Sequence, residues 1–562
     1  MSKIVQQTKD MLREIIEKAV AAAVSKGELP EAEMPEFIIE IPSNKANGDY
    51  SSNVAMAGAR CFKKAPRMIA ESIANNIDLS GTLFEKVEIA GPGFLNFFLS
   101  QQYYSEILKD VIACGDDYGK SDYGQGKRVL VEFVSANPTG PMHIGNARGG
   151  AIGDCLASVL DRAGFQVQRE FYVNDAGNQI EKFATSLEVR YLQHFDSSVE
   201  MPEDAYQGAD ITEHAENFIK EKGDAYVNVS SADRRKALVD YALPKNIQGL
   251  ERDLGRYRIT YDKWFKESTL HNDGSVDKVI EALKAKGATY EQDGALWFKA
   301  SEYGNDKDIV LVRANGLPTY IVPDIAYHYN KLVTRGYDKA IDVLGADHHG
   351  YVPRMKAALT ALGLDASRLD CVIMQMVRLV REGETIKLSK RSGKAITLNT
   401  LIDEVPLDAA RFFFNLREPN SHFDFDLELA AKQSSENPVY YVQYAHARIC
   451  SIIRKAQEQG VELKTPTDEQ LLLLNSDEER ELIRHLSALT DEVIAAAKSY
   501  DPARITHYVI ELATLFHKFY NAQRVMTDDE GLMQARLYLC TAVKDTIKNI
   551  LTMLKITTPE VM

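Results

Sequence analysis

The chain has 562 residues, of which 45% are hydrophobic and 26% are charged, and its formal net charge at pH 7 is −15. A chain of this length is expected to hold about three or four domains, and the composition is that of ordinary globular proteins. The six cysteines are scattered without a C-x-x-C pair. This pattern argues against a zinc knuckle and a disulfide framework, and it favours a cytoplasmic protein.

The acidic balance alone argues against a nucleic-acid partner, but net charge describes the average field and not local patches. Between residues 376 and 400 the balance is reversed, with six basic residues against Glu382 and Glu384. An acidic protein with a local basic site is compatible with a polyanionic substrate that must also be released. Charge therefore excludes no partner.

The N-terminal region, residues 1–115, is predicted to be a small α/β domain. It begins with an amphipathic helix over residues 1–27, whose apolar run Ala19 to Val24 is too short for a signal peptide or a membrane span. A polar turn at 42–53 opens a second helix, and residues 87–99 read as strand, Gly-Pro-Gly turn and strand. We expect no membrane partner.

A strand, a sharp turn and a glycine-rich helix follow one another between residues 129 and 157. Residues 129–134 are apolar and β-branched, which predicts a buried parallel strand. The prolines and glycine of residues 137–141 end it, and His143 leads into the helix. This arrangement places an imidazole beside an anion-binding helix N-terminus, where glycines allow a flat ligand to approach the backbone.

Ala136 to Asn146, in the form A-N-P-T-G-P-x-H-x-G-N, resemble the first signature of class I aminoacyl-tRNA synthetases, and the arginine-specific branch in particular. Asn146 stands where the general motif has a second histidine. Asparagine keeps a donor and an acceptor, so the resemblance implies phosphate contact without protonation. An isolated H-x-G match would instead favour His143 as a surface turn residue and glycines that serve packing.

The middle of the chain is predicted to complete a nucleotide-binding fold. A strand at 165–173 ends in polar residues, the position of ligand sites in doubly wound sheets. Residues of about 190–300 are expected to be either an insertion between two halves of this fold or an independent domain. The second half is predicted to resume with a strand at 308–313, followed by a helix headed by residues 320–324 and a strand at 339–344.

The strand at 339–344 runs into a loop that contains Asp347, His348 and His349. Adjacent histidines in such a loop do not easily face one ion, and no third ligand lies near in the sequence. We therefore expect no tightly bound metal.

The second motif is a basic loop, Lys387-Leu388-Ser389-Lys390-Arg391, after a strand at 377–380. By itself it reads as a solvated lysine-rich hairpin. It resembles the K-M-S-K-S signature of class I synthetases in four of five positions if Arg391 is accepted as the last, with Leu388 in place of methionine. The two signatures occur in the family's order, about 240 residues apart.

From Asp408 onward the chain is predicted to be helical, with connecting helices at 406–435 and a bundle at 436–562. The tyrosines that open the bundle are by default half-buried helix aromatics. They also match the anticodon-binding domain of arginyl-tRNA synthetases, which implies stacking on tRNA bases by Tyr440, Tyr444 and Arg448.

The resemblance to arginyl-tRNA synthetases covers nearly the whole chain and implies an α/β fold. A Rossmann-like class I catalytic domain with an insertion is expected at 120–405, between an N-terminal domain that touches the tRNA elbow and the helical anticodon-binding domain. The implied substrates are L-arginine, ATP with Mg²⁺, and tRNA-Arg. Arginyl-adenylate forms first, in a step that needs tRNA in this family, and arginine then passes to the tRNA 3′ end. A cytoplasmic monomer is expected.

The resemblance also implies site residues. Catalysis and ATP binding are expected of His143, Gly145, Asn146, Lys387, Ser389 and Lys390, and arginine binding is expected of Glu132, Ser135, Asn137, His143, Tyr320, Asp324 and His348. Tyr320 and Asp324 are four residues apart, so on a helix they share one face. Alternatively, Asp324 simply caps the helix that begins at Ile325.

Other functions remain open at this stage, the first of them that of another class I synthetase. A nucleotidyltransferase shares the H-x-G-H element but would not need the long insertion or the helical C-terminal region. A catalytically inactive tRNA-binding relative or a regulatory module would have no use for the lysine loop. ATP–pyrophosphate exchange with each amino acid separates these functions.

Overall fold

Five parallel strands form the central sheet of the computed structural model, which describes residues 3–42, 44–203, 205–386 and 396–562. The strand order is β12-β11-β5-β6-β7, so the order reverses at β5. Ligands of doubly wound sheets bind at such a switch point, outside the carboxyl ends of the strands. The strands are β5 (Arg128–Glu132), β6 (Gln166–Val173), β7 (Lys263–Lys266), β11 (Lys339–Gly345) and β12 (Leu369–Met374).

Helices cover both faces of the sheet. Alternate residues of a strand face opposite sides, and Ile341 packs in the cluster that contains α6 (Ile144–Arg162). Ala340 packs instead with α12 (Ile321–Tyr329) and α13 (Tyr351–Ala361). A Cβ at Gly153 would lie 2.3 Å from Cγ of Phe133, so glycine is what lets α6 approach β5 this closely.

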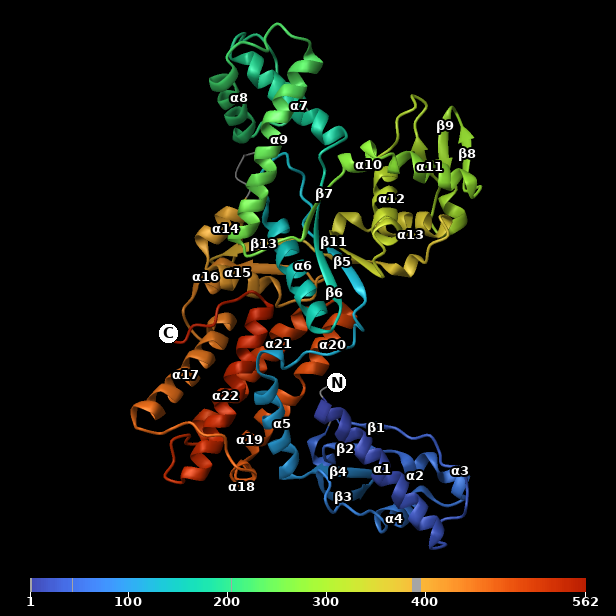
Figure 1. Cartoon of the computed structure of the whole chain (residues 1–562), viewed down its shortest axis with the longest axis vertical. Coiled ribbons are helices and arrows are strands. Elements are labelled where there is room, and N and C mark those ends of the chain that lie inside the picture. The colour runs from blue at the N-terminus through green and yellow to red at the C-terminus, as the bar shows by residue number, and fades with distance from the viewer. Residues whose placement is uncertain (1–2, 43, 204, 387–395) are drawn as a thin grey trace.

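The segment after β6 is a helical bundle with its own apolar cluster, the uppermost part of the molecule in Figure 1. We call it the insertion bundle. Its helices bury Phe183, Leu187 and Phe218 against one another. They are α7 (Asn178–Gln193), α8 (Ala209–Lys222) and α9 (Ser231–Arg256).

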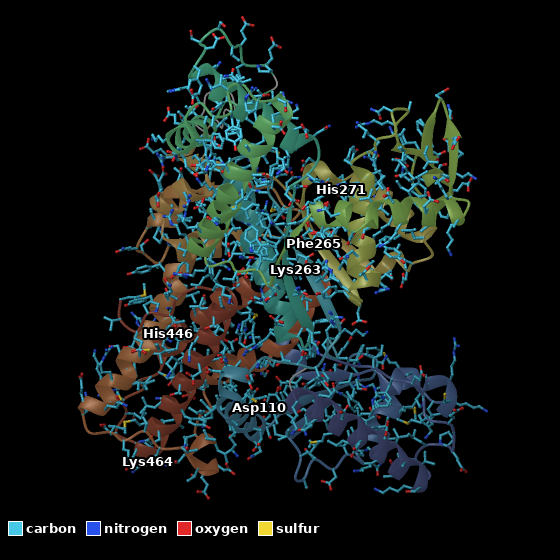
Figure 2. All side chains as sticks on the ribbon, turned by 45° about the horizontal axis from the view of Figure 1, so that its top comes forward. Asp110, Lys263, Phe265, His271, His446 and Lys464 are labelled. Carbon is cyan, nitrogen blue, oxygen red and sulfur yellow. The ribbon has the colours of Figure 1, made fainter. Side chains whose placement is uncertain are left out.

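The chain then returns to the central sheet as β7 before it leaves again. Figure 2 shows Lys263 and Phe265 of β7 near the middle of the molecule, and His271 in the next subdomain. The segment expected as one insertion at about 190–300 is thus interrupted by an edge strand of the central sheet. The structure has two subdomains instead of one insertion, one before β7 in the sequence and one after it.

The second subdomain carries a small antiparallel sheet in the order β10-β9-β8. The strand predicted to resume the nucleotide fold at 308–313 was therefore assigned to the wrong sheet, because it pairs antiparallel with β9. A four-residue apolar run is compatible with either sheet, and only the tertiary pairing decides. The elements are α10 (Ser268–Asn272), α11 (Ser275–Ala285), β8 (Thr289–Gln292), β9 (Ala295–Phe298) and β10 (Ile309–Val312).

The N-terminal domain combines α1, which buries Leu12 and Ile16 and contacts α4 and α5, with an antiparallel sheet in the order β1-β2-β4-β3. Figure 1 shows it as the blue unit below the central sheet. Helix α5 then leads to the catalytic domain. The elements are α1 (Lys3–Ser25), β1 (Ile39–Glu40), β2 (Tyr50–Ser52), α2 (Val54–Ala57), α3 (Ala59–Phe62), α4 (Pro66–Ala74), β3 (Phe84–Ala90), β4 (Phe94–Leu99) and α5 (Gln101–Cys114).

After β12 a short sheet of order β14-β13-β15 precedes the C-terminal helices. One continuous apolar cluster joins α6 to these helices, so the C-terminal region shares a core with the domain of the central sheet. No described helix is both long and apolar enough to cross a membrane. The elements are β13 (Val377–Arg381), β14 (Glu384–Thr385), α14 (Leu398–Glu404), α15 (Leu407–Phe414), β15 (Phe423–Asp426), α16 (Leu427–Ala431), α17 (Pro438–Glu458), α18 (Asp468–Leu471), α19 (Asp477–Ser487), α20 (Leu489–Ser499), α21 (Ala503–Ala522) and α22 (Glu530–Met553).

Candidate active site

His143 is the N-cap of α6, directly after β5 and the 137–141 turn. Its Nδ1 accepts a hydrogen bond from the Gly145 backbone N–H at 3.1 Å, and Asn146 Oδ1 accepts from the His143 backbone N–H at 3.0 Å. This reciprocal capping box fixes both side chains. Because Nδ1 is an acceptor, the proton of the neutral ring lies on Nε2, which makes Nε2 the donor of the imidazole.

Gly145 is needed for the position of that ring. A Cβ at residue 145 would lie 3.0 Å from Cε1 and 3.1 Å from Nδ1 of His143. A side chain at this position would therefore force the imidazole to shift by a few tenths of an ångström. The first signature thus places an imidazole at a helix N-terminus, where the positive end of the helix dipole favours phosphate.

The catalytic lysines expected in the second signature, Lys387 and Lys390, lie outside the described residues, as does Ser389. The segment that follows them does pair with the first signature. Thr397 forms an isolated antiparallel β-bridge with His143, and the Leu398 backbone N–H donates to the Met142 carbonyl at 2.9 Å. Two segments far apart in the sequence therefore meet at the start of α6.

A buried ionic network lies under the switch point. Lys331, fully buried in the π-helical turn η4 (Asn330–Thr334) after α12, donates to Glu132 Oε2 at 2.5 Å and to Asp342 Oδ1 at 2.8 Å. His328 Nε2 lies 2.7 Å from Asp342 Oδ2. Burial raises the pKa of Asp342, but Lys331 and His328 outweigh it and hold that pKa below its usual range. Lys331 and His328 thus favour the charged form of Asp342, and the Lys331 ammonium is paired with both Glu132 and Asp342.

Asp324 differs, because no hydrogen bond or ion pair among the described residues reaches its carboxylate. It lies in the first turn of α12, which begins at Ile321 with Tyr320 as N-cap, so it does not cap the helix. Burial raises the pKa of Asp324 well above its usual value, and the negative charges of Glu267 and Glu132 raise it further. An unpaired carboxylate among other carboxylates is a site for a cation.

Glu267 was not predicted from the sequence. It directly follows β7, and its pKa is raised by burial. Its position would have been predicted had β7 been recognised, because acidic residues at strand ends on this edge face the ligand site. The four residues of β7 lay within the expected insertion.

The other residues predicted to bind arginine lie at the same edge of the sheet in different states. Ser135 donates to Glu132 Oε1 at 2.8 Å, while Asn137 is exposed. Tyr320 is 69% exposed and its hydroxyl accepts from Arg354 Nη1 at 3.3 Å. His348 is exposed in η5 (Ala346–His348), where Nε2 lies 3.8 Å from Asp347 Oδ2. Electrostatics couple Glu132 and Asp324, whereas no hydrogen bond or ion pair among the described residues joins His348 to either.

Backbone strain marks the same turn. Val134 and Ser135 have φ angles of 69° and 39°. Left-handed backbone at residues other than glycine costs on the order of 1–3 kcal/mol each and persists where packing enforces it, often at active sites. Here the strain turns the chain from β5 so that Ser135 Oγ also accepts from the Tyr172 backbone N–H at 3.1 Å.

On α17 the predicted tRNA-binding residues form a stacked ladder. The rings of Tyr440 and Tyr444 are 9° from parallel with centroids 6.4 Å apart. Arg448 Nη2 donates to the Tyr444 hydroxyl at 2.7 Å, and its guanidinium lies 5.0 Å from the ring of Tyr520 on α21. A cavity of about 430 Å³ beside Tyr520 is lined by Lys455 and residues that follow α21.

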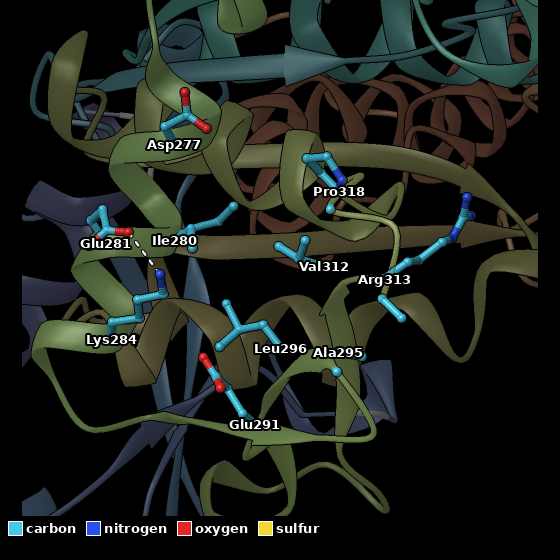
Figure 3. Close-up of a pocket in the computed structure, with 13 residues that line it drawn as sticks. Asp277, Ile280, Glu281, Lys284, Glu291, Ala295, Leu296, Val312, Arg313 and Pro318 are labelled. Carbon is cyan, nitrogen blue, oxygen red and sulfur yellow. Dashed lines mark hydrogen bonds and ion pairs between the residues drawn. The ribbon is translucent and has the colours of Figure 1, made fainter.

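Figure 3 shows a further pocket, of about 490 Å³, between α11 and the small sheet. Lys284 lies in it with Nζ 3.0 Å from Glu281 Oε1, and Asp277 and Glu291 add further acidic groups. None of the predicted site residues lines this pocket. Within the described parts of the chain, no group of three or more His, Cys, Asp or Glu side chains is arranged to hold a metal ion.

Three family models match the chain in sequence. They are the arginyl tRNA synthetase N-terminal domain at residues 10–99, the class I (R) tRNA synthetase catalytic domain at 108–451, and the DALR anticodon binding domain at 442–562. The chain belongs to the arginyl-tRNA synthetase family. It is therefore an aminoacyl-tRNA synthetase, a ligase with the α/β fold of class I enzymes.

Relatives of this arginyl-tRNA synthetase family match over full length. An arginine–tRNA ligase of Caldanaerobacter subterraneus subsp. tengcongensis is 55% identical over 562 residues, and that of Acetivibrio thermocellus is 50% identical over 564, with all of each chain covered. The solved arginyl-tRNA synthetase of Thermus thermophilus, at 23% identity, shares the fold with a TM-score of 0.72 over 98% of this chain and 100% of its own.

Proposed function

We propose that the protein is an arginine–tRNA ligase that makes arginyl-adenylate from L-arginine and ATP and then transfers arginine to the 3′ end of tRNA-Arg. The names of its full-length relatives support this activity. We propose arginine as the amino acid because the carboxylate of Asp324, at the switch point, has no ion-pair partner among the described residues. A cationic side chain is the ligand that this carboxylate lacks.

The guanidinium of arginine is planar, permanently charged and carries five donors, so it needs a fixed carboxylate and further acceptors. We place it against Asp324 and Glu267, with the Tyr320 hydroxyl at the entrance. Glu132 keeps its ion pair with Lys331. Together with Ser135 and Asn137 it faces the α-amino and carboxylate end of arginine, next to the 137–141 turn. His348 stays a proposed contact at the rim.

ATP is placed at the N-terminus of α6. His143 would hold phosphate oxygens through Nε2, and the helix dipole and backbone N–H groups favour the same negative charge. Asn146 would add its amide group, and Gly145 would keep the imidazole in place. Lys387 and Lys390, with Ser389 between them, would close over the pyrophosphate, and Mg²⁺ would arrive with ATP as part of the substrate.

The first reaction is attack of the arginine carboxylate on the α-phosphorus, with pyrophosphate leaving. No enzyme nucleophile is required, so this chain's residues contribute placement and cationic stabilisation of charge that grows on the phosphates. For the tRNA, stacking of anticodon bases on Tyr440, Tyr444 and Arg448 is proposed. We propose a cytoplasmic monomer, as the family resemblance implies.

ATP–pyrophosphate exchange tests the activity directly. It should require arginine among the twenty amino acids and should appear only with tRNA-Arg present. Exchange with another amino acid would reassign the specificity, and exchange without any amino acid would favour a nucleotidyltransferase. No exchange under any of these conditions, with tRNA binding retained, would favour an inactive tRNA-binding relative.

A further inference from the structure

Helix α9 crosses from the insertion bundle to the catalytic domain and carries a proline in its interior, Pro244. Residues before the proline, such as Leu238 and Ala242, pack in the bundle's own apolar cluster. Residues after it, such as Leu250 and Leu254, pack in the core that contains α6. Because proline removes a helical hydrogen bond and bends the helix, the boundary between the two cores lies at a hinge-type residue.

The bundle joins the central sheet at a second place that is also adaptable. Gly177, the N-cap of α7, has a φ of 76°, and a Cβ there would meet nothing within 4 Å. The bundle is thus connected at one end through a glycine with left-handed backbone and at the other through a helix that a proline bends. Contacts between side chains must then hold the insertion bundle against the catalytic domain.

One such contact reaches the first signature. Asn246, two residues after Pro244, donates from Nδ2 to the Pro138 carbonyl at 2.9 Å. Its Oδ1 lies 2.6 Å from Nε2 of His214 on α8, where the ring nitrogen acts as donor because an amide oxygen can only accept. The chain of contacts therefore runs from the bundle, through Asn246, to the 137–141 turn.

Asp210, at the start of α8, lies over the same turn. Its buried Oδ2 has no hydrogen-bond partner among the described residues and lies 4.0 Å from the Cβ position of Gly140. The C-terminal end of α9 contacts the segment that follows the second signature. There Arg256 donates to Asn399 Oδ1 at 2.6 Å and to Asp403 Oδ1 at 2.7 Å. Those residues belong to α14, which begins beside His143.

We infer that Asn246 is a positioning residue for amino-acid activation, which fixes the 137–141 turn to the insertion bundle through His214. The inference rests on the proposed function. Pro138 has no backbone N–H, so its carbonyl is its one polar group. The hydrogen bond from the Asn246 amide fixes the position of this carbonyl. The turn carries Asn137 and leads to His143, and a displacement of about 1 Å in such a turn can slow a reaction by roughly 10²-fold.

The test compares Asn246→Ala, Asn246→Asp, His214→Ala and the double variant in arginine-dependent pyrophosphate exchange with tRNA. Asn246→Asp keeps the size and the acceptor for His214 but loses the donor to Pro138. Asn217→Ala is the matched control, because Asn217 lies on α8 and its side chain accepts a hydrogen bond, among the described residues, only from exposed Lys220. Rates are normalised by active-site titration, and melting temperatures are recorded for each variant.

Asn246→Ala and Asn246→Asp are expected to lose about 10- to 100-fold in activation rate per active site, while Asn217→Ala stays near wild type. The double variant should lose no more than Asn246→Ala, because both substitutions break one chain of contacts. A loss that vanishes after normalisation, or additive losses, would overturn the inference. Wild-type protein without arginine-dependent exchange would instead refute the proposed function itself.

Discussion

Glu132 on β5 and Asp342 on β11 are register partners across the switch point of the central sheet, and the ammonium of Lys331 lies between their carboxylates. Removal of one member of such a buried group leaves an uncompensated charge. The three residues therefore form one buried ion-paired group, in which Lys331 is the partner of both carboxylates. Asp324 lies close to these residues without an ion-pair partner among the described residues, and the first three predictions depend on this difference.

Asp324→Asn should weaken arginine binding by about 2–5 kcal/mol, because the guanidinium loses its charged partner while the side chain keeps its shape. ATP binding should stay near normal. Isothermal titration with arginine measures the effect, and Asp306→Asn, an exposed carboxylate before β10, is the control. A variant that charges tRNA at wild-type arginine concentrations would place the pocket elsewhere.

The same substitution should stabilise the unliganded protein. The pKa of Asp324 is raised in the folded state, so the folded protein binds more protons than the unfolded chain. Stability is therefore lost as pH rises from the ordinary carboxyl pKa through the raised one. Asparagine avoids this cost, and the variant should melt at a higher temperature than wild type at pH 7.5, with a smaller gap near pH 4.5. Equal melting curves at both pH values would contradict this.

Arginine binding should release protons. A guanidinium against Asp324 favours the charged carboxylate and lowers the pKa that burial raises. Between the two pKa values, binding expels a proton and affinity rises with pH. Titrations in buffers of different ionisation enthalpy count the protons, and Asp324→Asn should release none from this group. Proton uptake, or an unchanged count in the variant, would show that Asp324 is not the partner of the guanidinium.

Local patterns were sufficient for part of this site. The His143 turn and the helix headed by Tyr320 follow from proline, glycine and apolar spacing within a few residues. Glu267 and Lys331 could not be found in this way, because β7 is only four residues long and Lys331 reads as a surface lysine on α12's continuation. Its burial depends on carboxylates from two strands. The Asn246 contact with Pro138 joins segments 108 residues apart and has no local pattern at all.

Lys390→Ala should slow activation on the order of 10²-fold with little change in ATP binding. Lys390 itself lies outside the described residues. The reason is differential binding, because a lysine that meets the leaving pyrophosphate only as charge develops stabilises the transition state. Single-turnover adenylate formation gives the rate, and equilibrium ATP binding gives the affinity. An equal loss in both would make Lys390 an anchor for ATP.

Arg448→Ala should raise the KM for tRNA by a factor that corresponds to about 1–3 kcal/mol, the usual cost of a lost stacking contact. Arg454→Ala is the control, because Arg454 is exposed on the same helix. Aminoacylation at varied tRNA concentration measures the effect, and exchange at limiting tRNA should fall in parallel. Deletion of residues 436–562 is a weaker test, since it would expose the core shared with α6. Equal KM values in the two variants would remove Arg448 from the tRNA surface.

His517 should make stability depend on pH. Burial, and then the nearby Arg448 cation, lower its pKa from 6.5 to about 4, and Arg448 Nη1 lies 3.4 Å from Nδ1. A depressed histidine pKa means that the unfolded chain takes up the proton first. The stability that the neutral ring contributes is present above pH 6.5 and is lost as pH falls towards 4.

His517→Gln stays neutral at every pH and tests this contribution. Denaturant unfolding of both proteins is compared between pH 7.5 and 4.5. The other histidines with a lowered pKa, His446 and His485, are present in both proteins and cancel in the difference. The free energy of unfolding of wild type, relative to the variant, should be constant above pH 7 and should fall below pH 6.5. Protonation of His517 places a positive ring against Arg448. The contacts of Arg448 with Tyr444 should therefore weaken over the same pH range. A pH-independent difference would mean that neither burial nor Arg448 lowers the pKa of His517 in solution.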